Sequence, residues 1–565
     1  MTTPTRALAA IVAASAVALL VVSLLLPDRP IALDTSAWRS AASRTPAGAY
    51  HVHTSRSDGA ADADAVAAAA GRAGLQFVIF TDHGDGTRAP DPPAYRHGVL
   101  CIDGVEISTD DGHYVALGMR PAPYPLGGAA SAVVEDVARL GGFGIAAHPD
   151  SPKESLHWRD TVSPIDGIEW LSADTEWRNE SRRSLTRALI GYLVRPGPAL
   201  AMMLDRPVTL GRWDAMVRTR RVVALAALDA HGGIGRAVED GARRAVANVP
   251  SYEASFRTFS IRVRLDRSLT GDAAADGRVL LTAIREGNVF TAIDALAAPG
   301  LLEFYADTAA GRVEMGGAAP AGTPAQLVAR VLAPTTAQVA IVDDSASARR
   351  GGIAAVGASR RFAPDGTQEL HARLGAGQGA FRVEVNLPSA PGTPRVPWLV
   401  SNPIYFLPPA PPPAHLPPAT VQQTIDPAAW RLEKDPASSA TIAGQPPALS
   451  FRLAPGARAS QYVALSAPLT PADFSAVRVR LLAGRPMRVA VQLRRADGQR
   501  WRTSTYVDTT ADTATIPATR FRKVEGTWEP FAAAAFTSVL LVVDLVTAHP
   551  GDAGRRVGAE VALLR

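Results

Sequence analysis

The apolar residues in the first half of the chain fall in short continuous runs. These runs read GAYHVH, FVIFTDH, VLCIDGVE, FGIAAH and VVALAALDAH. A strand that is covered on both faces shows an unbroken apolar run, so each is predicted to be a buried strand. Between them, residues 62–73 form an Ala-rich stretch with Asp near its start, and SAVVEDVARLGG from Ser131 has a Ser start and a Gly stop. Both patterns predict helices, and strand, helix and strand form the repeating unit.

From Arg257 the pattern changes to alternation of apolar and polar residues. The segments are RTFSIRVRLD, LVARVLA, VAIVDD, FRVEVNL and PWLVSNPIYF. Alternation is typical of half-buried antiparallel strands, so a second, mainly β domain is predicted over residues 238–407. Within it, GRVLLTAIREGNVFTAID predicts one helix that ends at Gly287 and is followed by a strand.

A proline-rich stretch, LPPAPPPAHLPPAT, separates this region from the last part of the chain. Proline cannot join a sheet interior, so residues 408–420 are predicted to be a semi-rigid spacer. At least six strand patterns follow and predict a β-sandwich of jelly-roll or galactose-binding type over residues 421–565. Trp430, Trp501 and Trp528 are candidates for a glycan platform there. Filling of the sandwich core is the favoured alternative.

The chain begins with an apolar stretch from Ala7 to Leu26 that contains only Ser15 and Ser23 as polar residues. At about 1.5 Å per residue a helix of this length spans roughly 30 Å, the thickness of a bilayer core. Residues 1–30 are therefore expected to contain a single-pass transmembrane anchor in the cytoplasmic membrane, with the bulk of the chain periplasmic or extracellular. A cleaved signal peptide that releases a secreted protein is the alternative.

Charge and cysteine content narrow the function classes. The net charge is +5 over 565 residues, and no basic cluster is interleaved with aromatic residues. Nucleic acid is therefore not an expected partner. Cys101 is the single cysteine and cannot form an internal disulfide. It lies inside an apolar run, which indicates a small buried side chain.

The chain contains nine possible metal ligands, most of which stand just behind the apolar runs: His51, His53, Asp58, His83, Glu106, His113, His148, Asp229 and His231. The carboxyl ends of buried parallel strands converge on one face, so these side chains are expected to meet. Imidazole and carboxylate suit zinc, manganese or iron, and the lack of thiolates favours a catalytic site over a closed structural one.

Most of the histidines share this context. Of eleven histidines in the chain, His97, His157, His371, His415 and His549 lack it, and the other six stand in these motifs. A single histidine after a strand is more often a hydrogen-bonded core or surface residue than a ligand. The HxH pair (His51 and His53) and the DxH pair (Asp229 and His231) occur in the same chain, so a chance arrangement of histidines is a poor explanation of the pattern.

The motifs HVHTSRSDG, FTDHGD, GVEIS, GHYVALG, AAHPD and LDAHG, in this order, resemble the PHP (polymerase and histidinol phosphatase) superfamily of metal-dependent hydrolases. Every ligand position of the family pattern is filled, although LDAH stands where SDAH is common. The resemblance covers about residues 45 to 235. The elements REGNVFTA and PWLVSNPIYF are similar to the CehA/McbA (carbaryl-hydrolase-like) branch and extend it to about residue 406.

The resemblance implies a distorted (β/α)7 barrel over residues 45–237, followed by two β-sandwich-like domains, the first Ig-like, so the expected fold class is α/β plus all-β. It also implies two or three divalent metal ions. His51, His53, Glu106 and Asp229 would hold one, with Glu106 bridging to a second. How the remaining five ligands divide between the metals stays open.

The function implied is ester hydrolysis by a metal-bound water that bridges the ions. A small phosphorylated ester is the leading substrate, and a carbamate, amide or carboxylic ester is the alternative. Arg56 and Arg88 are candidates to bind a substrate anion, against the alternative of solvated surface arginines. A different class of function is a catalytically idle envelope scaffold or glycan-binding protein.

Overall fold

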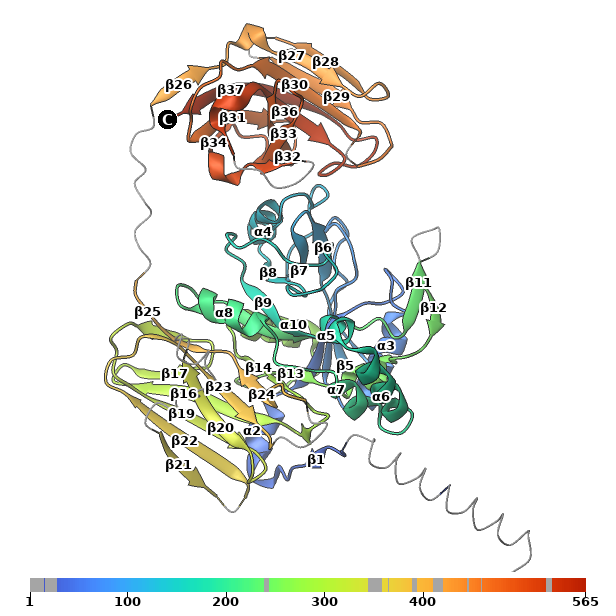
Figure 1. The fold of residues 1–565 in the computed structure, drawn as a ribbon, viewed down its shortest axis with the longest axis vertical. Helices are drawn as coiled ribbons and strands as arrows, with labels where there is room; N and C mark the ends of the chain where they lie inside the picture. Colours follow the sequence, from blue (N-terminus) through green and yellow to red (C-terminus); the bar gives the residue numbers. More distant parts are fainter. Residues whose placement is uncertain are drawn as a thin grey trace, which may run out of the picture.

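The fold is taken from a computed structural model of the full chain. It describes residue 15 and residues 28–237, 243–343, 358–363, 365–388, 394–409, 420–444, 447–458, 460–524 and 531–565. Figure 1 shows the C-terminal β region beside the helix-bearing N-terminal unit (residues 45–237), with a smaller β region on the other side.

The largest sheet has eleven strands and contains the start of the N-terminal unit. At its centre β2, β3 and β5 run parallel, and β13 joins the far side of β2 antiparallel. The strands are β4 (Ala94–Arg96), β5 (Val99–Asp103), β3 (Phe77–Phe80), β2 (Ala47–Val52), β13 (Ser260–Val263), β14 (Val289–Ala292), β24 (Leu399–Ser401), β23 (Gly379–Asn386), β25 (Ile404–Leu407) and β18 (Ala318–Pro320), with β20 (Gln338–Asp343) paired to β23.

A second sheet of five strands completes the unit. In spatial order these are β10 (Val223–Ala227), β9 (Gly167–Ser172), β8 (Phe143–Ala146), β7 (Gly112–Leu117) and β6 (Val105–Thr109). β7 is antiparallel to both of its neighbours, β6 and β8, whereas β8, β9 and β10 are parallel. The two sheets meet through single bridges between Val52 and Ala230 and between His83 and Glu106.

Helices cover these sheets, and several begin at side-chain caps. Asp62 caps α3 by accepting a hydrogen bond from the Ala65 N–H, and Asp272 caps α10 in the same way. The helices are α2 (Arg39–Ser43), α3 (Ala63–Arg72), α4 (Ala130–Arg139), α5 (Ala173–Asn179), α6 (Arg182–Tyr192), α7 (Pro196–Ala201), α8 (Thr209–Val217), α9 (Tyr252–Phe256) and α10 (Ala273–Arg285). α3, α4 and α10 confirm the helices predicted from the sequence.

The predicted (β/α)7 barrel is wrong. Its strands divide between the two sheets, which are joined by two isolated bridges. The physical reason is that several neighbouring strands follow one another as hairpins, without a helix between them. β4 pairs antiparallel with β5, and β6 pairs antiparallel with β7. A parallel barrel needs a crossover helix after each strand, and these pairs have none.

The mainly β region after residue 237 shares the large sheet with the N-terminal unit, because β13 pairs with β2 and β14 pairs with β24. Against it lies a five-stranded sheet with β17 (Gly311–Glu314), β16 (Leu301–Thr308), β19 (Ala325–Leu332), β22 (Thr367–Leu374) and β21 (Ala358–Phe362). Two small pairs are β1 (Ile31–Ala32) with β15 (Ala297–Ala298), and β11 (Ile234–Ala237) with β12 (Arg243–Ala247). The two regions that the sequence predicts as separate domains therefore share one sheet.

The C-terminal region consists of two six-stranded sheets. One contains β26 (Val421–Thr424), β28 (Ser439–Ala443), β29 (Ala448–Arg452), β31 (Ala476–Ala483), β34 (Asp512–Pro517) and β37 (Ala553–Leu564), and the other β27 (Arg431–Lys434), β30 (Tyr462–Pro468), β32 (Met487–Arg495), β33 (Arg500–Val507), β35 (Arg522–Lys523) and β36 (Phe536–Asp544). Side chains of both sheets share one apolar core. We call this region the C-terminal sandwich.

The tryptophans of this sandwich are buried where they are described. Trp430 is 3% exposed and Trp501 is 1% exposed. Both fill the core, as the favoured alternative predicted, and neither offers a platform to a glycan. Trp528 lies outside the described residues.

Among the described residues, no helix is both long enough and apolar enough to cross a membrane. The apolar stretch from Ala7 to Leu26, where the sequence predicts a transmembrane helix, lies outside the described residues apart from Ser15.

A buried ion pair joins the C-terminal sandwich to α4. Arg488 on β32 is 1% exposed and donates two hydrogen bonds to Asp136, at 2.6 and 2.9 Å, and one to Glu135 at 3.0 Å. Beside it the Arg139 guanidinium lies 3.8 Å from the ring centre of Tyr506 on β33. A two-pronged arginine–carboxylate contact requires a fixed geometry, so the sandwich is docked against the N-terminal unit.

We expect Arg488→Ala to release the sandwich. Removal of Arg488 leaves the buried Asp136 with only the longer contact of 3.8 Å to Arg139, and loss of a buried pair costs up to about 3–5 kcal/mol. Small-angle scattering should show a larger radius of gyration, and proteolysis between residues 408 and 420 should become faster. Arg494→Ala is the control, because Arg494 pairs with Glu433 inside the sandwich. Unchanged scattering for Arg488→Ala would show that the contact does not hold the two parts together.

Candidate metal centre

Glu106 on β6 lies at the centre of a group of five imidazoles. Its Oε2 is 3.4 Å from His51 Nε2, 3.3 Å from His53 Nε2 and 3.0 Å from His83 Nδ1. Its Oε1 is 2.8 Å from His113 Nδ1 and 2.9 Å from His148 Nε2. The carboxylate is 1% exposed, and the His83 side chain, at 37%, is the most exposed of its five partners.

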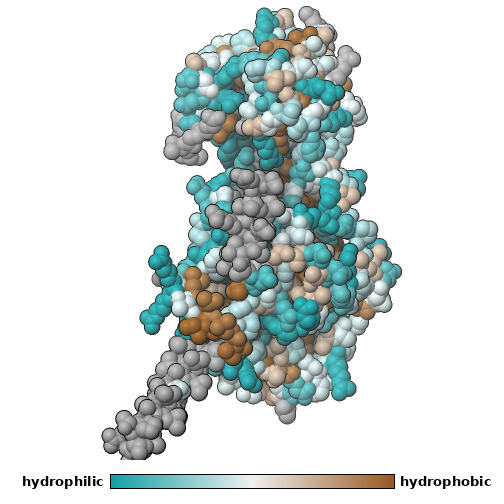
Figure 2. Space-filling model, turned by 90° about the vertical axis from the view of Figure 1, so that its right-hand side faces the viewer, coloured by the Kyte–Doolittle hydropathy of each residue, from teal (hydrophilic) through white to brown (hydrophobic). Residues whose placement is uncertain are grey.

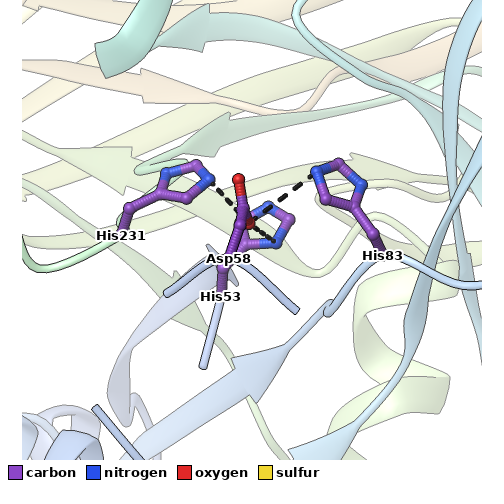
Figure 3. Close-up of side chains that lie close together, drawn as sticks. All are labelled: His53, Asp58, His83 and His231. Atoms are coloured by element: carbon purple, nitrogen blue, oxygen red, sulfur yellow. Dashed lines mark ion pairs between the residues drawn. The ribbon is translucent and has the colours of Figure 1, made fainter. Parts of the chain in front are cut away.

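Two further predicted ligands, Asp58 and Asp229, also contact histidines of the cluster. Asp58 Oδ1 lies 3.2 Å from His231 Nε2, 3.5 Å from His53 Nδ1 and 3.8 Å from His83 Nε2. Figure 3 shows Asp58 with His231 on one side and His83 on the other. Asp229 Oδ1 lies 3.3 Å from His53 Nε2 and 3.6 Å from His51 Nε2.

The structure therefore brings all nine predicted residues together, in four overlapping groups whose ligand atoms lie within 4.8 Å of one another. We call these residues the nine-residue cluster. Glu106 belongs to two of the groups, one with His51 and His148 and one with His83 and His113. This shared position suits the bridging role that the resemblance implies.

The backbone is unusual at three cluster positions. His51, His148 and Asp229 have φ values of 61°, 28° and 44°. Residues other than glycine rarely adopt positive φ, and such strain concentrates at functional sites. His51 lies within β2, where it interrupts the regular pairing of β2 with β3. Both the alternation of side chains along β2 and the irregular backbone at His51 therefore direct His51 and His53 toward the cluster.

The cluster fits divalent cations. The buried Nε2 atoms of His51 and His53 have no hydrogen-bond partner among the described residues. Two ligands that each lie 2.0–2.2 Å from a tetrahedral ion are roughly 3.4 Å apart. The separations of 3.3 to 3.6 Å between these nitrogens and the oxygens of Glu106 and Asp229 match that spacing.

The carboxylates of the cluster also favour the binding of positive charge. Burial lowers the pKa of His53, but the carboxylates of Asp229 and Glu106 raise it to about 9. Burial also lowers the pKa of His148, and Glu106 raises it to about 9. Burial raises the pKa of Glu106, but the surrounding imidazoles, His51 first, hold it well below its usual range. The buried carboxylates thus attract positive charge, which protons or metal ions supply in competition.

Glu169 on β9 contacts two residues of the cluster, and the sequence prediction missed it. Its Oε1 lies 2.6 Å from His51 Nδ1, and its Oε2 accepts a 2.6 Å hydrogen bond from the backbone N–H of His148. A carboxylate on Nδ1 fixes the imidazole with Nε2 free for a metal. The sequence offered one sign of this residue, a single acid in the mainly apolar strand GIEWLS. The structure shows Glu169 to be 1% exposed.

Asp82, the residue before His83, holds the loop that follows β2. It accepts hydrogen bonds from the Thr54 N–H at 2.8 Å, the Thr54 hydroxyl at 2.7 Å and the Ser57 hydroxyl at 2.6 Å. The Ser57 hydroxyl lies 3.3 Å from His53 Nδ1. Asp82 therefore positions the loop that carries Asp58.

The two predicted substrate-binding arginines already have carboxylate partners. Arg56 contacts Asp91 at 2.5 Å and Asp103 at 3.1 Å. Arg88 contacts the same two acids, Asp103 at 2.5 Å and Asp91 at 3.3 Å. These contacts organise the loops after β3, and binding of a substrate anion by either arginine stays a prediction.

A pocket of about 390 Å³ opens beside Asp229 and His231. We call it the apolar pocket, because α5, α6 and α7 line it mainly with apolar side chains, among them Leu185, Ala188 and Leu200. Arg178 and Glu176 also line it, and burial raises the pKa of Glu176 to about 7. Figure 2 shows a hydrophobic area on the face that carries these helices. Leu189, which is 55% exposed, lines the pocket from α6.

Comparison with known proteins gives limited information. No protein-family model matches the chain, and no curated protein matches it. Among solved structures, the family 11 carbohydrate-binding module of the cellulosomal cellulase Lic26A-Cel5E of Clostridium thermocellum is 15% identical, with 24% of this chain and 86% of that chain covered at a TM-score of 0.19. TmCBM61 in complex with β-1,4-galactotriose is 16% identical, with 24% and 89% covered at a TM-score of 0.16. At these TM-scores the likeness assigns neither family nor function.

We expect Glu169→Gln to weaken metal binding about 10–100-fold, because the amide no longer fixes His51 as strongly. Calorimetric titration of the chelator-treated protein with Zn²⁺ or Mn²⁺ measures this directly. Glu154→Gln is the matched control, since Glu154 is exposed and outside the cluster. Equal affinity of Glu169→Gln and the unchanged chain would remove Glu169 from the site.

Proposed function

We propose that the chain is a metal-dependent hydrolase that acts on ester bonds. The observation that carries this proposal is the convergence of nine imidazole and carboxylate side chains around Glu106. The sequence resemblance to the PHP superfamily supports the same conclusion, because these are the residues that match its motifs.

In this proposal the cluster residues bind the metal ions and hold them in place. His51, His53, Glu106 and Asp229 would hold one ion, and the other five residues would complete the site around one or two more. When bound, the ions would lower the pKa of a coordinated water and neutralise charge on the oxygens of a phosphate ester. Phosphomonoester or phosphodiester hydrolysis is therefore the leading reaction class. His83 and Asp58 have side chains 37% and 27% exposed, so we expect substrate and water to enter on this side of the cluster.

A second candidate is hydrolysis of a carboxylic ester, amide or carbamate by the same site. The apolar pocket favours it, because its lining suits an alkyl or aryl group and its volume falls in the usual range for small-molecule sites. Arg178 lines this pocket and is paired with Asp174 at 2.5 Å. It could orient a polar group of the substrate at the pocket's edge.

We expect His51→Ala and Asp229→Ala each to abolish hydrolysis and to lower the bound metal. Each change removes a donor that contacts the centre of the cluster. Elemental analysis and an assay with phosphomonoesters, phosphodiesters, carbamates and aryl esters test both effects. His97→Ala is the control, because His97 is an exposed histidine that pairs with Asp64. A chain that holds no metal and turns over none of these esters would be a scaffold or a binding protein instead.

We expect Ala188→Trp to fill the apolar pocket and to raise KM for aryl and alkyl esters about tenfold, with a smaller effect on methyl esters. Ala188 is 5% exposed and lines the pocket. Leu193→Trp is the matched control, because Leu193 lies just after α6 and is 82% exposed. Metal content and thermal melting verify that both variants are folded. The same KM for long and short esters in Ala188→Trp would exclude the pocket from substrate binding.

A further inference from the structure

Two pockets flank the nine-residue cluster. The apolar pocket reaches it at Asp229 and His231. A second pocket, of about 340 Å³, borders it on the side of His83 and His113: Gly84 and Asp85 line it directly after His83, and Ser108, whose hydroxyl lies 3.3 Å from His113 Nε2, lines it as well. His231 lines the apolar pocket, and His83 directly precedes two residues that line the second pocket. These two histidines lie on either side of Asp58 (Figure 3), so the two pockets lie toward different ends of the cluster.

The second pocket lies between the N-terminal unit and the C-terminal sandwich, and we call it the interdomain pocket. The sandwich supplies Arg458, His549 and Leu545 to its lining. The contact around it is close, since a Cβ on Gly127 would lie 2.6 Å from Arg458 Nη2. The Arg488 ion pair and a ring contact between Tyr124 and Tyr506, with centroids 6.4 Å apart, hold the same interface.

The polar groups of the interdomain pocket include both donors and acceptors. The exposed Arg458 guanidinium donates one hydrogen bond to the Val546 carbonyl at 3.2 Å. Asp85 accepts hydrogen bonds from Thr87 through Oδ1, and its Oδ2 lies 4.0 Å from His549 Nε2. A hydroxyl group both donates and accepts, so it can bind to arginine, histidine and carboxylate together. A second anion would suit this lining less well, because Asp85 would repel it.

Small apolar surfaces stand beside these polar groups. Pro125 and Leu126 contribute them from the N-terminal unit, and Leu545, Ala548 and Pro550 from the sandwich. A pocket with a few convergent polar groups and apolar walls is typical of a small-molecule site. Here the combination matches a sugar or another polyol, whose hydroxyls alternate with C–H groups.

We propose that the substrate is an amphiphilic ester in which an alkyl or aryl group is linked to a sugar or polyol. The apolar group occupies the apolar pocket, the hydroxylated group occupies the interdomain pocket, and the ester bond lies at the cluster between them. This inference rests on the proposed hydrolase function and names its substrate class. It also gives the C-terminal sandwich a role, since the sandwich forms one wall of the substrate site.

The reaction balances as a simple hydrolysis. Water adds across the bond: its oxygen bonds to the acyl carbon or the phosphorus, and the bond from that atom to the alcohol oxygen breaks. One proton of the water goes to the leaving alcohol oxygen, and the products are an acid and an alcohol. No oxidant or further reactant is needed.

The test uses the full chain and n-octyl β-D-glucoside, below the concentration at which it forms micelles. Its octyl and sugar groups are joined by a glycosidic bond, which ester hydrolysis does not cleave. Calorimetry compares its affinity with those of glucose and 1-octanol. We expect the glucoside to bind about tenfold more tightly than either half alone. In Arg458→Ala, the affinity for the glucoside should fall close to the affinity for 1-octanol. In Ala188→Trp, it should fall close to the affinity for glucose. Arg478→Ala, a basic position on β31 that does not line this pocket, is the control.

An activity measurement completes the test. The metal-loaded chain should hydrolyse octanoyl glucose with a higher kcat/KM than methyl octanoate. Arg458→Ala should reduce that preference about tenfold through KM, and Arg458→Lys should restore part of it. Equal binding of the glucoside by Arg458→Ala and the unchanged chain would overturn the inference. A chain that binds the glucoside as expected but hydrolyses no ester would instead overturn the proposed hydrolase function and leave the two pockets as a binding site.

Discussion

The buried carboxylate of Glu106 is the contact on which the N-terminal unit depends. Its side chain meets five imidazoles from four separate parts of the chain, and its backbone joins the two sheets. The Glu106 carbonyl accepts from the Gly84 N–H at 3.0 Å, and its own N–H donates to the Asp82 carbonyl at 3.2 Å. The same residue therefore connects the sheets and centres the cluster. A buried charge in this position requires compensating partners, and the five imidazoles around Glu106 provide them.

The candidate site was more predictable from the sequence than the fold. Each ligand motif is local, and its position just behind an apolar run is enough to predict where the side chain emerges. The order of His51, Glu106 and Asp229 along the chain then implied one common site, and the structure brings these residues together. Closure into a barrel is a long-range property, and it failed because hairpins such as β6 with β7 replace the crossover helices.

Other features lay beyond the sequence for definite reasons. Glu169 stands alone in its strand, so no spacing marks it as a partner of His51. The docking of the C-terminal sandwich depends on Arg488, one of 58 basic residues, and nothing local distinguishes it from the others. The sharing of one sheet between the N-terminal unit and the following β region depends on pairing of β13 with β2, whose residues are about 210 positions apart in sequence.

The left-handed backbone at His51, His148 and Asp229 has a consequence for how the site can vary. Apart from glycine, the residues most at ease in this conformation are Asn, Asp and His. Two of these three also carry the groups that bind metal. The main chain thus restricts the amino acids tolerated at these three positions even before a cation is bound, and β-branched residues are excluded by sterics alone. Substitutions at these three positions in related chains would then be limited to Asn, Asp, His and Gly. A related chain that no longer binds metal could still keep one of these four residues at each position.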